Sequence, residues 1–376
     1  MSADEISAAE LEDEIVRRAA VAILDVRPAA DVTQWRIDPN GRPFLNLPES
    51  EISADPAAAV SAIRAMGQNG GELRTLCNRG VASMRAASAL SEAGLSVASV
   101  AGGMIAWSRL LVPAPVDIGT DTAVAQFRRE ARGCLSYLVA SEGEALVVDP
   151  GPDVHAYVEE ASRLGARVTH VLDTHVHADH LSGGRSLADQ TGATLHLSAK
   201  SLARGLQYAA RVSAVSDRDR IPVGSAQIEV VDLPGHTTDN IGVLVDGRAL
   251  IAGDSLFADS VARPDLEAGD EGAADAARIL HGTLSERILG LPGDTLLLPC
   301  HYPGGRLGGS LAPPIGDVAA KVDFLALDED EFATEVVADM PPRPANYLNI
   351  IAVNLGAESG ADVAGLEVGA NSCAAR

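Results

Sequence analysis

The sequence is poor in aromatic residues and lysine, and its charge is mostly of one sign. Phe, Trp and Tyr make up 3% of its 376 residues, and Lys200 and Lys321 are the only two lysines. Its 29 basic and 52 acidic residues give a formal net charge of −23. Because phosphate binding requires clustered Lys and Arg, this balance argues against a nucleic-acid partner. The acidic residues are spread along the chain, which indicates solubility rather than an interaction tail.

The four cysteines form no CxxC pair, so neither a disulfide framework nor a zinc ribbon is expected. No segment approaches the roughly 18 apolar residues of a membrane span. The first residues, MSADEISAAELEDEIVRR, lack the basic and apolar regions of a secretory signal. We therefore expect a cytoplasmic protein with no membrane partner.

The chain is long enough for two domains, and its pattern changes near residue 112. Before that point, short apolar runs such as VAILDV (21–26) alternate with helical segments, which predicts a parallel sheet with flanking helices. Proline and glycine in LVPAPVDIGT predict a linker at 113–121. From 122 to 376, hairpins interleaved with helices predict sheets covered by helices. The expected fold class is α/β throughout.

Side chains that bind metals follow the ends of several predicted strands in the second domain. Seven residues share this placement: His175, His177, Asp179, His180, His236, Asp254 and His301. The first four form an HxHxDH loop directly after the strand VTHVLD. Strands of a sheet that deliver His and Asp at one end are what a shared metal site requires. The remaining histidines lack this context and are expected to be structural or on the surface: His155, His170, His196 and His281.

This loop resembles the HxHxDH loop of the metallo-β-lactamase superfamily, and the resemblance covers about 120–356. Two further segments are similar to persulfide dioxygenases: GDSLFADSVARPDLE (253–267) and MPPRPANYLNIIAVN (340–354). The resemblance implies an αβ/βα sandwich. It also implies a single Fe(II) per chain on the facial triad His175, His236 and Asp254. The other loop residues would orient ligands and hold waters: His177, Asp179, His180 and His301.

The resemblance further implies a reaction and an assembly. A low-molecular-weight thiol persulfide, such as glutathione persulfide, would be oxidised by O₂ to sulfite and thiol. Arg263 is interpreted as a bidentate partner for a substrate carboxylate, with Asp265 orienting it. An ordinary structural ion pair is the alternative for Arg263. The family resemblance also implies a homodimer.

The same ligands leave a second interpretation open, a dinuclear zinc hydrolase of glyoxalase II type that acts on a thioester. Two zinc ions would then share the seven side chains: the first on His175, His177 and His236, the second on Asp179, His180 and His301, and both on Asp254. Only the resemblances at 253–267 and 340–354 favour iron. A third interpretation is a non-catalytic sulfur-binding or regulatory protein with a structural metal.

The first domain, 1–112, resembles a rhodanese in three motifs: LDVRP (24–28), LCNRGVAS (76–83) and VAGGMIAW (100–107). Cys77 follows a strand and precedes a helix, so backbone N–H groups can form an anion nest that stabilises a Cys persulfide. We therefore predict that Cys77 is the catalytic thiol. Asp25 and Arg27 are expected to hold its loop. The other cysteines are predicted to be non-catalytic: Cys134, Cys300 and Cys373.

Two features depart from the rhodanese pattern. Ala82 stands five residues after the cysteine, where the family loop usually has Arg, and Arg79 is a partial substitute. The segment WRIDPNGRPFLNLPESEI (35–52) replaces the usual Gly-His-Ile-Pro-Gly-Ala stretch. Together the two domains predict persulfide oxidation coupled to sulfane-sulfur transfer through Cys77. The direction of that transfer stays open.

Overall fold

The computed structural model describes residues 3–66, 71–302, 309–338, 340–344, 346–357, 365–367 and 373–374. The chain divides into two compact units, one holding Met1–Leu110 and the other Leu111–Glu367, to which Cys373 and Ala374 also belong. Among the described residues, no helix combines the length and the apolar character needed to cross a membrane.

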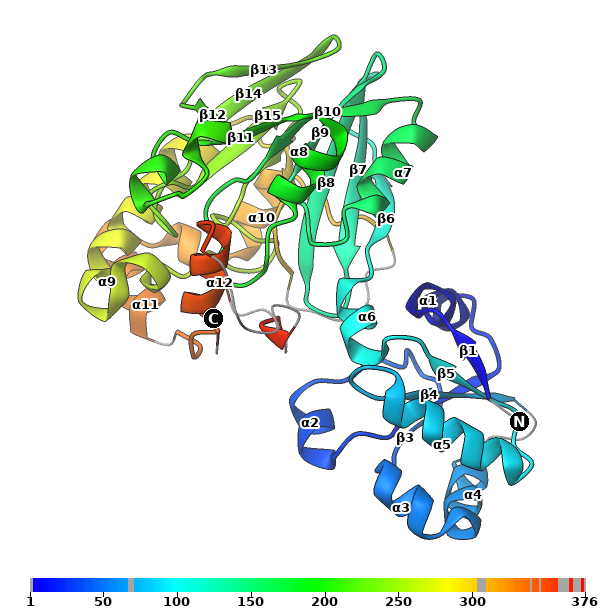
Figure 1. Ribbon diagram of the computed structural model, residues 1–376. Helices are drawn as coiled ribbons and strands as arrows, with labels where there is room; N and C mark the ends of the chain where they lie inside the picture. The colour runs from blue at the N-terminus through cyan, green and yellow to red at the C-terminus, as the bar shows by residue number, and fades with distance from the viewer. Residues whose placement is uncertain are drawn as a thin grey trace. The chain divides into compact units, whose positions relative to one another are not determined.

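The first unit is built on a parallel sheet. Its strands are β1 (Asp4–Ile6), β2 (Val21–Asp25), β3 (Phe44–Asn46), β4 (Glu72–Leu76) and β5 (Val97–Val100). They pair in the order β1-β5-β4-β2-β3 (Figure 1). The strands alternate with α1 (Ala8–Val16), α2 (Ala29–Gln34), α3 (Glu49–Ala54), α4 (Pro56–Ala65), α5 (Val81–Glu92) and α6 (Gly103–Arg109). Every residue of β2 is buried, as expected for a strand covered on both faces. The predicted strand-helix alternation is therefore confirmed.

The second unit contains two sheets that pack face to face. The strands of the larger sheet are β6 (Val112–Val116), β7 (Ala123–Arg129), β8 (Cys134–Ser141), β9 (Glu144–Val148), β10 (Arg167–Leu172), β11 (Thr194–Ser198) and β12 (Val212–Val215). Those of the smaller sheet are β13 (Arg220–Val223), β14 (Ala226–Asp232), β15 (Ile241–Val245), β16 (Ala249–Ile251) and β17 (Leu296–Leu298). The larger sheet runs in the order β12-β11-β10-β9-β8-β7-β6, and the smaller one from β13 to β17 in chain order. A core that includes Tyr137, Val148, Val230 and Val243 fills the space between them.

Helices cover the outer face of each sheet (Figure 1). On the larger sheet, α7 (His155–Arg163) and α8 (Gly184–Thr191) pack through Tyr157 and Leu187 against Leu138 and Val147. On the smaller sheet, α9 (Asp265–Gly282), α10 (Ile315–Lys321) and α11 (Glu329–Ala338) cover the face that bears Leu250. This layering confirms the predicted αβ/βα sandwich. The remaining described helices are η1 (Ser201–Arg204), η2 (Ala209–Arg211), η3 (Thr283–Ile288), η4 (Asp323–Ala326) and α12 (Tyr347–Asn354).

Part of the segment predicted as a linker, 113–121, is a strand. β6 pairs antiparallel with β7 and forms the edge of the larger sheet. Its residues Pro113 and Pro115 fit there because an edge strand has N–H groups that need no partner in the sheet. The prolines that suggested a loop are therefore equally compatible with an edge strand.

The two facing sheets bring the predicted metal-binding residues to one end of the sandwich. His175 follows the end of β10, His236 follows β14, Asp254 follows β16 and His301 follows β17. β16 and β17 are parallel neighbours, so Asp254 and His301 leave the smaller sheet at the same edge. The fold thus positions the site through strand ends, as the sequence predicted.

Candidate metal centre and sulfur-transfer loop

Three of the predicted ligands form a compact group. His175, His236 and Asp254 each offer one buried ligand atom, and these atoms lie within 4.8 Å of one another. The His236 Nε2 atom lies 3.4 Å from Asp254 Oδ2, and the His175 Nε2 atom lies 3.9 Å from the same oxygen. Both Nε2 atoms and Asp254 Oδ2 make no hydrogen bond within the described part of the chain. Because unsatisfied buried polar atoms are costly, this donor set fits a metal ion that would bind all three side chains.

Hydrogen bonds on the far side of each imidazole set its tautomer. The His236 Nδ1 atom donates to the Arg263 carbonyl oxygen at 2.7 Å. The His175 Nδ1 atom lies 3.0 Å from Thr174 Oγ1, whose single proton goes to Asp149 Oδ2 at 2.9 Å. Thr174 Oγ1 therefore accepts from His175. Both Nε2 atoms keep their lone pairs on the side of Asp254, as metal ligation requires. Burial also lowers the pKa of His175 well below its usual value, so this ring is neutral.

His177 pairs with Asp149 on one side of its ring, and its Nδ1 atom makes no hydrogen bond within the described residues. Its Nε2 atom lies 3.0 Å from Asp149 Oδ1. Burial lowers the pKa of His177, but the Asp149 carboxylate outweighs that effect and raises the pKa to about 9. Asp149 also accepts from the Thr174 backbone N–H at 2.7 Å and from the Cys300 thiol at 3.0 Å. Asp149 thus holds the HxHxDH loop in place through its hydrogen bonds. No motif in the sequence indicated this role for Asp149.

The other predicted residues gather beside Asp254. The His301 Nε2 atom lies 3.1 Å from Asp254 Oδ1 and 3.4 Å from Asp179 Oδ2. The His180 Nδ1 atom lies 3.1 Å from Asp179 Oδ1. All seven predicted metal-binding residues are buried. The structure therefore brings together every residue of the set, with Asp254 between its two halves.

Arg263 pairs with Asp265, the residue predicted to orient it. Its side chain is 1% exposed, and its guanidinium donates to the two Asp265 oxygens at 2.7 and 3.0 Å. A third donor reaches the Pro342 carbonyl oxygen at 3.2 Å, and Asp265 also accepts from Arg343 at 2.8 Å. These contacts are those of a structural ion pair, and the substrate-binding role of Arg263 stays a prediction. Arg263 serves the centre through its backbone carbonyl, which orients His236.

Two residues from the C-terminal part of the chain hold the HxHxDH loop. The Asn354 amide donates to the carbonyl oxygens of His177 and His180, both at 2.9 Å, and accepts from the Ser182 N–H at 3.0 Å. Glu367 accepts from the Leu181 N–H at 2.9 Å. Sequence reasoning missed both residues. The only available signal was that Asn354 ends the segment 340–354.

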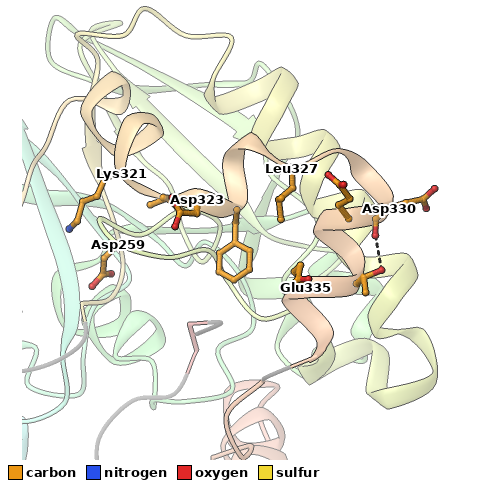
Figure 2. Close-up of a pocket in the computed structure, with 10 residues that line it drawn as sticks. Asp259, Lys321, Asp323, Leu327, Asp330 and Glu335 are labelled. Atoms are coloured by element: carbon orange, nitrogen blue, oxygen red, sulfur yellow. Dashed lines mark hydrogen bonds between the residues drawn. The ribbon is translucent and has the colours of Figure 1, made fainter.

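Two cavities are relevant to a small substrate. One of about 390 Å³ has His236 on its wall, with Lys200 and Glu267 as its charged lining residues. Another, of about 790 Å³, lies over η4 and α11 and is shown in Figure 2. Its wall is largely acidic and includes none of the predicted site residues. The smaller cavity is therefore the better candidate for substrate entry.

Cys77 lies in a tight loop between β4 and α5. Its Sγ atom accepts from the Gly80 N–H at 3.1 Å. The Ser83 hydroxyl lies 3.3 Å from Sγ and 3.0 Å from the Gly80 carbonyl oxygen, so its single proton serves one of the two at a time. Gly80 has a φ of 86°, which favours glycine. Arg27 pairs with Asp25 at 2.6 Å and reaches the Asn78 side chain at 3.5 Å, so it holds the loop as predicted. Ser83, next to Ala82, is a donor to the thiol that sequence reasoning did not single out.

Comparison with known proteins covers both units. The metallo-beta-lactamase superfamily model matches residues 129–301, and the rhodanese-like domain model matches residues 7–110. The chain is 32% identical over 211 residues to the hydroxyacylglutathione hydrolase of Polaromonas sp., covering 54% of this chain and 76% of that protein. It is 31% identical over 163 residues to the mitochondrial persulfide dioxygenase ETHE1 of Homo sapiens, covering 42% of this chain and 59% of that protein.

The fold of the second unit is also similar to that of a solved structure. The structure of ETHE1 from Myxococcus xanthus matches with a TM-score of 0.53 and 28% identity, over 61% of this chain and 96% of that one. The relatives include both a hydrolase and a dioxygenase, so they do not decide the reaction. From its fold, its site and these relatives, the chain belongs to the metallo-beta-lactamase superfamily and carries a rhodanese-like domain at its N-terminus.

Proposed function

We propose that this protein oxidises a low-molecular-weight thiol persulfide, such as glutathione persulfide, with O₂ and water to sulfite and thiol: both O₂ atoms pass to the outer sulfur, and water supplies the third oxygen as the S–S bond breaks and the thiol leaves. The site would hold one iron on His175, His236 and Asp254. The observation that carries the proposal is the grouping of these three ligand atoms within 4.8 Å, in a set that does not include His177. Two imidazoles and one carboxylate form the donor set of mononuclear iron oxygenases.

The iron, when bound, would supply open coordination positions for dioxygen and for the substrate sulfur. The chain's own residues prepare that site. Arg263 and Thr174 hold the two imidazoles, and the three ligands are at most 1% exposed, which keeps bulk water away. The cavity of about 390 Å³ beside His236 is our candidate for the thiol end of the substrate.

We also propose that Cys77 carries sulfane sulfur as a persulfide. The Gly80 N–H donates to its sulfur, and the Ser83 hydroxyl lies 3.3 Å away, where it can turn its proton toward a thiolate or persulfide anion. A persulfide would then be the substrate of one unit and the carried group of the other. A cytoplasmic location and a dimeric assembly stay predictions.

Thioester hydrolysis with two zinc ions is the second candidate function. The likeness to a hydroxyacylglutathione hydrolase favours it, as does the presence of Asp179 and His301 beside Asp254. Zinc ions, when held by these residues, would supply an activated water for hydrolysis of the thioester. This reaction needs no O₂, so a measurement of O₂ consumption distinguishes the two candidate functions.

The deciding experiment measures O₂ consumption by anaerobically purified, Fe(II)-loaded full-length protein given glutathione persulfide, with sulfite and metal analysis on the same sample. We expect O₂ uptake with sulfite formation and one iron per chain. His236→Ala should abolish uptake, whereas His155→Ala, an exposed histidine on α7, should not. Absent uptake, with two zinc ions and hydrolysis of a hydroxyacylglutathione, would replace this proposal with the second candidate.

A further inference from the structure

Ser99 is a buried residue of β5 whose hydroxyl connects to the Cys77 loop through a second hydroxyl, that of Ser83. Every residue of β5 is buried, and the Ser99 side chain is fully so. Its Oγ atom donates to Ser83 Oγ at 2.9 Å. Because burying a hydroxyl costs free energy that an alanine at this position would not, packing alone does not account for Ser99.

The Ser83 hydroxyl lies among three polar groups. Ser99 donates to it, which occupies one of its two lone pairs. Cys77 Sγ lies 3.3 Å from Ser83 Oγ, and the Gly80 carbonyl oxygen lies 3.0 Å from it. The donation from Ser99 therefore leaves the single Ser83 proton two acceptors among the described residues. Both acceptors belong to the Cys77 loop, so the Ser83 proton is directed into that loop.

Thr75 holds the same residue from the neighbouring strand. It lies directly opposite Ser99 in the register of β4 and β5. Its hydroxyl donates to the Ser83 carbonyl oxygen at 3.0 Å, while the Ala98 carbonyl oxygen is a weaker acceptor at 3.5 Å. Thr75 thus contacts the backbone of Ser83, and Ser99 contacts its side chain. All three side chains are fully buried, so bulk water does not compete for these hydrogen bonds.

We propose that Ser99 is a positioning residue for the Cys77 sulfur, because it keeps the Ser83 hydroxyl oriented to donate to a thiolate or persulfide anion. Beside a neutral thiol, the Ser83 proton serves the Gly80 carbonyl oxygen. Beside an anion it turns to the sulfur, since hydrogen bonds to charged groups are stronger. The Ser99 donation persists in both states and strengthens the Ser83 O–H as a donor, because hydrogen bonds in a chain polarise one another. This inference rests on the proposed role of Cys77 as a sulfur carrier.

The test follows alkylation of Cys77 by iodoacetamide in reduced, full-length protein from about pH 5 to about pH 10, read at the Cys77 peptide by mass spectrometry. Ser99→Ala should react about 3- to 10-fold more slowly than wild type near neutral pH, because less thiolate is present. Its limiting rate at high pH should not be lower, since the thiolate is then fully formed. A general loss of structure would instead change the rate at every pH. Ser99→Cys keeps the shape with a weaker S–H donor and should lie between the two.

Two controls separate positioning from packing. In a Ser83→Ala background, Ser99→Ala should cause no further change, because Ser99 acts through the Ser83 hydroxyl. Thr75→Val removes an equally buried hydroxyl that contacts the backbone of the same residue, and it should keep the wild-type pH profile. Circular dichroism checks that each variant is folded. If Ser99→Ala does not fold, Ser99→Cys provides the same comparison.

Three results would overturn the proposal: a wild-type profile in Ser99→Ala, a Ser99→Ala effect that persists without the Ser83 hydroxyl, or an equal loss in Thr75→Val. Alkylation requires no metal and no sulfur substrate, so sulfur transfer is measured separately on the same samples. Transfer by wild type, with Ser99→Ala unchanged in alkylation, would refute this inference and keep the carrier role of Cys77. The expected alkylation profiles without any transfer would refute the carrier role and leave Ser99 positioning the sulfur.

Discussion

Asn354 offers the sharpest test of how the C-terminal part of the chain supports the metal loop. Asn354→Ala removes the donors to the His177 and His180 carbonyl oxygens and the acceptor for the Ser182 N–H. At about 1 kcal/mol for each net hydrogen bond, the three sum to ~3 kcal/mol. Because Asn354 is only half-buried, water can replace part of this, so we expect a loss of about 1–2 kcal/mol in the free energy of unfolding.

The larger effect should be on metal binding. Groups that orient metal ligands from outside typically change affinity by about 10- to 100-fold. We therefore expect the iron affinity of Asn354→Ala, measured by chelator competition, to fall by about that factor. Asn349→Ala, on the exposed face of the same helix, should bind iron like wild type. Equal affinities for the two variants would refute the claim that Asn354 shapes the loop for the metal.

Three further predictions concern single contacts. Thr174→Val should lower iron affinity by about 10-fold or more in chelator competition, because His175 loses the acceptor that sets its tautomer; unchanged affinity would contradict this. Cys77→Ser should abolish sulfurtransferase activity and spare O₂ uptake; loss of uptake with the metal still bound would show that the sites are not independent. Arg129 outweighs burial and lowers the pKa of Glu367 from 4.5 to about 2. Their ion pair should therefore contribute about 3 kcal/mol of stability above pH 4.5, lost as pH falls toward 2. In urea unfolding, the difference between wild type and Glu367→Gln should shrink over that range, and a difference independent of pH would refute it.

The grouping of the candidate metal-binding residues was predictable because the signal of each residue is local. Each of them follows a short apolar strand, and the ends of neighbouring strands meet in space. The layer arrangement was predictable for a similar reason. Alternating strands and helices in the first domain, and hairpins in the second, can each be recognised from short stretches of sequence. The role of β6 was not, because proline excludes only the inner strands of a sheet and leaves the edge open.

The supporting residues were not predictable, because tertiary contacts alone bring them to the loop. Asn354 lies 177 positions from His177, and Glu367 lies 186 positions from Leu181. No spacing rule joins residues so far apart. Arg263 illustrates a different difficulty. The pair with Asp265 is visible in the sequence, but its burial, which decides between a substrate contact and an ion pair, is not.

The choice between one iron and two zinc ions therefore depends on the contacts around the ligands rather than on their identities. All seven side chains suit either metal centre. Asp149 orients both histidines of the loop, because it holds His175 through Thr174 and pairs with His177 Nε2. That pairing leaves His177 Nδ1 without a hydrogen bond within the described residues. The two assignments therefore differ in whether His177 Nδ1 joins His175 and His236 on the first ion.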